Sequence, residues 1–138
     1  MFVHPAVIVH GLSDARAALA PGLPVTLLSA TGAALFAGCL WWREITASAR
    51  AEYPATPATD ILDCADASGL AMSALRSGVN RLVLWPDAPG WAAVAAIAAG
   101  QGGFVLPAAP PALDLAQRNA RRHLDAWLAK GDSATPTG

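Results

Sequence analysis

The sequence predicts an α/β domain with a mainly parallel sheet that is covered by helices on both faces. Short apolar runs rich in β-branched and large apolar residues recur along the 138 residues. Long alanine-rich segments separate these runs, as crossover helices separate the strands of α/β proteins. The runs are continuously apolar and do not alternate with polar residues, which is typical of parallel strands buried on both faces.

The expected strands and the first two helices follow from local patterns. Apolar residues from Leu12 to Leu19 recur at helical spacing, and the Pro21–Pro24 segment ends that helix. A second helix begins near Gly32 and runs to about Glu52, because the residue before Pro54 avoids the α region. The expected strands are 6–10, 25–28, 60–64, 81–85 and 104–106.

Three further helices complete the pattern. One begins at the capping segment 66–68 and closes at Ser77–Gly78, where glycine suits the left-handed C′ position. The next runs from about Trp91 to Ala99. The last, about Leu113–Ala129, carries the cleanest amphipathic stripe of the chain.

These elements predict a three-layer α/β/α architecture. Five parallel strands with right-handed crossovers suit the flavodoxin-like, Rossmann-like order 2-1-3-4-5. We expect residues 1–130 to form this single domain and residues 131–138 to be a flexible C-terminal tail.

Composition excludes several classes of protein. Charged residues make up 14 % of the chain, against roughly 25 % in an average soluble domain. The longest uncharged stretches are broken by proline and glycine, so no membrane span is expected. The net charge of −1 does not indicate the basic surface that nucleic-acid-binding proteins carry. Cys39 and Cys64 are isolated, and with no signal-peptide pattern they are expected to be reduced thiols of a cytoplasmic protein.

Polar residues at strand ends are the first candidates for chemistry. Ligands of open α/β sheets sit outside the carboxyl ends of the strands. There His10 ends the first expected strand, Asp63 lies near the end of the third, and Asp66 follows it. A histidine beside carboxylates has the parts of a general base, although aspartates at strand-to-helix junctions are also ordinary caps. No metal site is expected, and the sequence does not indicate a cofactor.

The segment after the second expected strand is the second candidate. Ser29, Thr31 and Gly32 precede a helix, and backbone N–H groups at a helix start bind phosphate when small residues allow close approach. An ordinary helix cap explains the same residues. Ser13 and Asp87, at other strand ends, complete the expected ligand-binding set.

Trp41 and Trp42 are the candidates for a subunit contact. Adjacent residues of a helix point about 100° apart, so one face of the domain cannot bury both rings. Aromatic residues are enriched in interface cores. We therefore expect a homodimer, although one ring packed on the sheet and the other on a loop would also satisfy the pattern.

The segment Asp63–Pro86, with its core Ser77-Gly-Val-Asn-Arg-Leu-Val-Leu-Trp-Pro86, resembles one βαβ unit of aldolase-type phosphate-binding barrels. Such units end a helix in a small residue plus glycine and close the next strand with an aromatic residue and proline. The resemblance implies a strand, a helix and a parallel strand. It implies no catalytic residue, because Lys130 is the only lysine and lies at the end of the last helix.

No catalytic signature stands out, so function is predicted only as a class. The leading expectation is a domain that binds a small anionic or phosphorylated ligand at the carboxyl edge of the sheet. One alternative is a small hydrolase or lyase using His10 with Asp63 or Asp66. Another is a homodimeric scaffold without a ligand.

Overall fold

A six-stranded parallel sheet forms the centre of the structure, a computed structural model that describes residues 2–135. The order of the strands is β6-β5-β4-β3-β2-β7, and all five neighbouring pairs are parallel. The strands are β2 (Ala6–Ile8), β3 (Val25–Leu28), β4 (Ala58–Asp63), β5 (Arg81–Val83), β6 (Phe104–Leu106) and β7 (Ala112–Asp114).

The prediction of an α/β fold with a parallel sheet is confirmed, but the predicted strand count and order are wrong. From β2 to β6, each strand is added beside the one before it in the chain and always on the same side. The order 2-1-3-4-5 would instead require the third strand to be added on the other side of the first. The additional strand β7 then returns to the far side of β2, where Ile8 pairs with Asp114.

The helices are α1 (Leu12–Leu19), α2 (Ala33–Phe36), α3 (Cys39–Glu52), α4 (Ser68–Arg76), α5 (Trp91–Gly100), the 3-10 helix η1 (Ala120–His123) and α6 (Leu124–Leu128). The single helix expected up to Glu52 is divided into α2 and α3 because Gly38 adopts φ +86°.

The long helix expected at Leu113–Ala129 is replaced by β7, a turn, η1 and α6. The Asp114 carboxylate accepts a hydrogen bond from the N–H of Ala116, and Asn119 adopts φ +62°. Both features favour a turn over a continuous helix, although the apolar stripe survives in the buried Leu124 and Leu128.

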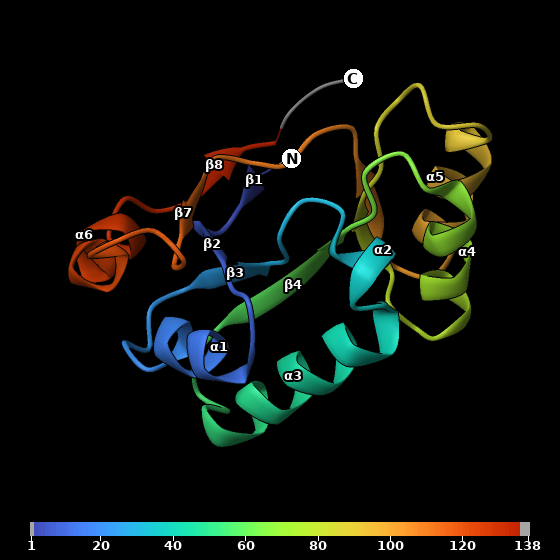
Figure 1. Cartoon of the computed structure of the whole chain (residues 1–138). Helices are drawn as coiled ribbons and strands as arrows, with labels where there is room; N and C mark the ends of the chain where they lie inside the picture. Colours follow the sequence, from blue (N-terminus) through green and yellow to red (C-terminus); the bar gives the residue numbers. More distant parts are fainter. Residues whose placement is uncertain (1, 136–138) are drawn as a thin grey trace.

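The helices form one layer, so the expected second helical layer is absent from the described residues. Right-handed crossovers between successive neighbouring strands bring every connecting helix to the same face of the sheet. Accordingly α1 contacts α3, α3 contacts α4, and α4 contacts α5. Figure 1 shows the helices in an arc around the strands, from α6 through α1 and α3 to α4 and α5.

As in a (β/α) barrel, parallel strands are covered by helices on the outer face, but the sheet of the described chain is not closed. Asp63–Pro86 forms the strand, helix and parallel strand that its resemblance implies, as β4, α4 and β5. Within residues 2–135, β6 and β7 do not pair with each other, so the sheet remains open between them.

Apolar residues fill both faces of the sheet. The outer face and the helices share the larger core, which includes Trp42 and Leu19. Alternate residues point to the inner face, where a separate cluster contains Ala6, Leu28, Ile61, Val83 and Leu106. Burial on both faces explains why the strands read as continuous apolar runs.

The two ends of the described chain pair with each other. Strand β1 (Phe2–Val3) is antiparallel to β8 (Ser133–Ala134), and His4 Nδ1 lies 2.7 Å from Asp132 Oδ1. Within the segment 131–138, which the sequence predicts to be a flexible tail, residues 132–134 contact the start of the chain. Residues 136–138 of that segment lie outside the described residues.

A bilayer span would need a long apolar helix, and none of the helices in the described part of the chain has both the length and the apolar character.

Candidate functional site

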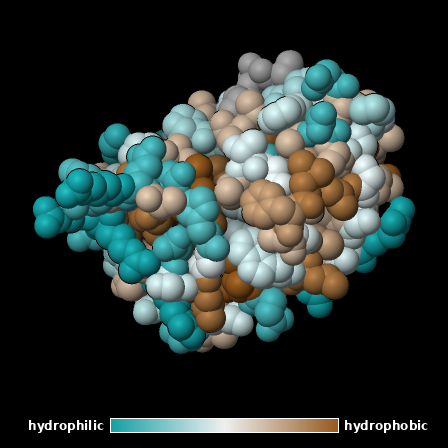
Figure 2. Space-filling view, viewed as in Figure 1, coloured by the Kyte–Doolittle hydropathy of each residue, from teal (hydrophilic) through white to brown (hydrophobic). Residues whose placement is uncertain are grey.

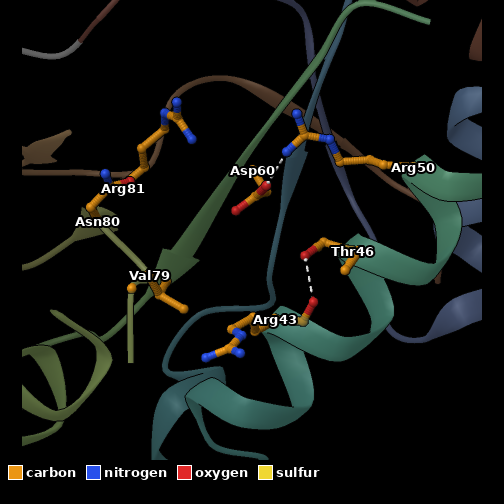
Figure 3. A pocket seen from close by; sticks show the side chains of 9 residues that line it. Arg43, Thr46, Arg50, Asp60, Val79, Asn80 and Arg81 are labelled. Carbon is orange, nitrogen blue, oxygen red and sulfur yellow. Dashed lines mark hydrogen bonds and ion pairs between the residues drawn. The ribbon is translucent and has the colours of Figure 1, made fainter. Parts of the chain in front are cut away.

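A cavity of about 210 Å³ lies between α3 and the amino end of β5 and is lined mainly by polar residues (Figure 3). Three arginines face it, Arg43 and Arg50 from α3 and Arg81 from β5. We call it the arginine pocket. Its lining comprises Arg43, Thr46, Ala47, Arg50, Asp60, Gly78, Val79, Asn80 and Arg81.

The sequence of α3 builds one wall of the arginine pocket. Positions 43, 46, 47 and 50 recur at spacings of three and four, so they share one face of the helix. The other face buries Trp42, Ile45 and Ala49 against the core, which fixes the rotation of the helix. The opposite wall turns at Gly78, where φ is +84°, and leads directly into β5.

The three arginines of the pocket differ in whether their guanidinium groups already have hydrogen-bond partners in the protein. Arg50 Nη1 donates to Asp60 Oδ2 over 2.9 Å, and Arg43 Nη1 donates to the carbonyl of Ser77 over 2.8 Å. The guanidinium group of Arg81 has no hydrogen bond or ion pair with any residue of the described chain. Three arginines and one aspartate leave a formal charge of +2 on the lining of the pocket, whereas the whole chain carries −1.

Guanidinium groups in this number can hold an anion. Each presents planar N–H donors that match the oxygens of a phosphate or a carboxylate. The hydroxyl of Thr46 is already used within α3, where it donates to the carbonyl of Trp42 over 2.9 Å. The available donors of the pocket are therefore mainly cationic, which favours an anionic group over a neutral one.

None of the pocket residues belongs to the sites that the sequence indicated. The only local signal is the placement of Arg43 and Arg50 on one helical face, which is equally typical of a solvated surface. Arg81 joins them only because α3 packs near the start of β5, a relation that no pattern in the sequence reveals.

The segment expected to bind phosphate is occupied by the protein itself. The Gly32 N–H donates to Asp63 Oδ1 over 3.1 Å, and the Ser29 hydroxyl accepts the N–H of Asp63 over 2.8 Å. Helix α2 has only four residues, and the side chain of Thr31 is exposed. The carboxylate of Asp63 thus sits where the expected ligand anion would have to bind.

The other expected site residues are dispersed. Asp63 is buried, whereas Asp66, Ser13 and Asp87 are exposed. The ring of His10 hydrogen-bonds to Asp114, which no pattern in the sequence indicates as its partner. In the described residues no hydrogen bond joins the ring to Asp63. Within residues 2–135, no group of three or more histidine, cysteine, aspartate or glutamate side chains is arranged to hold a metal ion.

Burial controls the ionisation of two neighbouring groups at the end of β4. Burial raises the pKa of Asp63 above its usual 3.8, against the opposing effect of hydrogen bonds from the N–H groups of Ala65 and Gly32. Burial, together with the charges of Asp63 and Cys39, raises the pKa of Cys64 to about 12. The Cys64 thiol therefore stays protonated at neutral pH and is a core residue, not a nucleophile.

The raised pKa of Asp63 gives a testable pH dependence. A carboxyl group whose folded pKa exceeds its unfolded value contributes stability that is complete below about pH 4 and is lost as pH rises through the folded pKa. Asparagine keeps an oxygen for the N–H groups of Gly32 and Ala65 without the buried charge. We expect Asp63→Asn to gain stability relative to the wild type between pH 4 and 7, measured by urea unfolding.

The control for this prediction is Asp63→Ala. It leaves the N–H groups of Gly32 and Ala65 without their acceptor and is expected to be about 2 kcal/mol less stable than Asp63→Asn at every pH. A stability difference between Asp63→Asn and the wild type that stays constant from pH 4 to pH 7 would contradict the assignment.

The paired tryptophans are placed unequally. Trp42 is fully buried in the core, whereas Trp41 is half-buried beside it, with ring centroids 6.0 Å apart. Trp42 therefore has no surface to offer a partner, and the homodimer remains a prediction. The exposed apolar side chains Leu35, Phe36 and Leu40 lie close by along the chain, and Figure 2 shows apolar residues gathered over the region of α2.

Comparison with known proteins adds no further assignment: no protein-family model matches the chain, and no match is found among curated proteins or solved structures.

Proposed function

We propose that this domain binds a small anionic ligand, carrying a phosphate or carboxylate group, in the arginine pocket. The observation that supports the proposal most directly is that Arg81 lines the cavity, beside two further arginines, and that its guanidinium group has no partner among the described residues. The ligand class agrees with the expectation from the sequence. The proposed location differs, because the pocket lies near the amino ends of β4 and β5.

Asp60 sets the affinity in this proposal. Its carboxylate already neutralises Arg50 at 2.9 Å, and its side chain is only 18 % exposed. An incoming anion must therefore compete with Asp60 for Arg50, while Arg81 is free to bind it. Removing the Asp60 charge and removing the Arg81 charge should have opposite effects on affinity.

Isothermal titration with inorganic phosphate at low ionic strength tests the proposal. We expect Arg81→Gln to raise the Kd about tenfold or more, since a hydrogen bond to a charged group contributes about 1.5–3 kcal/mol. Asp60→Asn should lower the Kd. Titration with malonate then tells whether a carboxylate is accepted as well as a phosphate.

Arg118→Gln is the matched control, because Arg118 is an exposed arginine outside the pocket. It should leave the Kd unchanged while removing the same formal charge. Equal effects of Arg81→Gln and Arg118→Gln, or no binding of either anion at millimolar concentration, would overturn the proposal.

A further inference from the structure

A second cluster of polar side chains lies at the opposite, carboxyl edge of the sheet. His10 follows β2 and Asp114 ends the neighbouring strand β7, and His10 Nε2 lies 2.6 Å from Asp114 Oδ1. Both side chains remain accessible, at 36 % and 30 % exposure. In barrels and open sheets built of parallel strands, active sites occupy this edge.

The surroundings of Asp114 fix the tautomer of His10. Burial alone would raise the pKa of Asp114, but hydrogen bonds from His10 and from the N–H of Ala116 lower it below 3.8. An ionised carboxylate only accepts hydrogen bonds, so Nε2 of His10 carries the hydrogen. The lone pair is then on Nδ1, which has no hydrogen-bond partner in residues 2–135.

The carboxylate of Asp14 links a guanidinium group to the backbone of His10. Asp14 Oδ2 accepts the backbone N–H of His10 over 2.9 Å, and Asp14 Oδ1 accepts Arg121 Nη2 over 2.9 Å. The same Nη2 lies 3.4 Å from the hydroxyl of Ser13. The side chain of Arg121 is 54 % exposed, so its other N–H groups can reach an incoming anion.

We propose that His10, positioned by Asp114, is a general base that hydrolyses a small ester whose anionic group is held by Arg121. His10 Nδ1 takes a proton from water while the water oxygen bonds to the ester carbonyl carbon. The tetrahedral adduct then breaks its bond to the leaving oxygen, which receives the proton from the imidazolium. The products are a carboxylic acid and an alcohol or phenol, and neutral His10 is restored.

A second histidine–aspartate pair in the chain can be compared with His10 and Asp114. His4 and Asp132 form a histidine–aspartate pair of similar length, 2.7 Å, and similar histidine exposure, 31 %. That pair lies before β2, at the amino end of the strand, and the described residues place no arginine on it. Imidazole chemistry that needs only a neighbouring carboxylate would occur at both pairs, whereas the proposed activity requires the His10 cluster.

The test is hydrolysis of 4-acetoxybenzoate, which carries a carboxylate, and of phenyl acetate, which does not. We expect His10→Gln to lower the protein-dependent rate by about 100-fold or more, the usual contribution of a general base, and His4→Gln to leave it unchanged. Arg121→Gln should slow hydrolysis of 4-acetoxybenzoate and leave that of phenyl acetate unaffected.

Asp114→Asn tests the positioning role by a readout that loss of structure alone would not give. We expect a lower rate, because an amide no longer holds the imidazole with its hydrogen on Nε2, and we expect Asp114→Glu, which keeps a carboxylate, to restore part of the rate. Near-ultraviolet circular dichroism verifies that each variant is folded. Wild-type rates for His10→Gln, or equal losses for His10→Gln and His4→Gln, would overturn the proposal.

Discussion

Replacing Trp42 with alanine is expected to destabilise the domain by about 3–5 kcal/mol, the usual cost of removing a fully buried tryptophan. Trp42 is the largest side chain with no exposed surface, and it anchors α3 to the core. Domains of this kind have total stabilities of about 5–15 kcal/mol, so the loss is a large part of the whole. Urea unfolding at neutral pH measures it as a lower midpoint.

Two further variants show which part of Trp42 matters. The Nε1 of Trp42 is the one buried side-chain nitrogen or oxygen in the described residues that has no hydrogen-bond partner. Trp42→Phe removes that unpaired donor while keeping much of the ring, so we expect it to cost less than half as much as Trp42→Ala. Trp41→Ala, at a half-buried position, is the matched control.

The result also decides between two roles for Trp42. If the ring belongs to a subunit contact, Trp42→Ala changes the sedimentation coefficient and leaves the stability of the monomer intact. If it belongs to the core, unfolding shifts and Trp41→Ala has the smaller effect. Equal losses from the two alanine variants would contradict the core assignment.

The second large effect is expected at Gly103, where the chain enters β6. A Cβ atom placed on Gly103 would lie 1.9 Å from the carbonyl oxygen of Asn80. That oxygen accepts the N–H of Phe104 over 2.9 Å, so the clash is with backbone that holds β5 and β6 together. Because no rotamer change relieves it, we expect Gly103→Ala to cost at least about 3 kcal/mol by thermal or urea unfolding.

Gly100→Ala is the control for this prediction, three residues earlier in the chain. Gly100 is the last residue of α5, and a Cβ added there meets nothing within 4 Å. Alanine in place of glycine in a helix stabilises by about 0.5–1 kcal/mol. If both substitutions had the same sign, the close approach of β5 and β6 at Gly103 would be refuted.

The local elements could be predicted from the sequence, because their signals are local. The strand around Val25–Leu28 is a continuous apolar run that is buried on both faces. Helix α5 begins at Trp91 and ends at Gly100, one residue beyond the expected Ala99. Strand β7 was missed because the apolar stripe that follows Leu113 and Asp114 places them at the start of a helix, whereas Asp114 forms a turn.

The relations between elements could not be predicted, because they depend on which surfaces pack. The partner of His10 is Asp114, which lies 104 positions away in the sequence. The arginine pocket likewise depends on packing, because α3 and β5 bring Arg81 near Arg43 and Arg50 only in the folded chain. A sheet in which successive strands are neighbours and a sheet with the order 2-1-3-4-5 have the same succession of strands and helices along the chain, so the sequence pattern cannot distinguish them.

That order of successive neighbours has a consequence for how the chain folds. From β2 to β6, every strand pair forms by closing a connection that contains only one or two helices, which costs little chain entropy. The pairing of Ile8 with Asp114, and of Phe2 with Ala134, requires the whole intervening chain to be brought back. We therefore expect the sheet to form first from successive βαβ units. The pairing of β2 with β7 and of β1 with β8 is expected to be the slow, final step of folding.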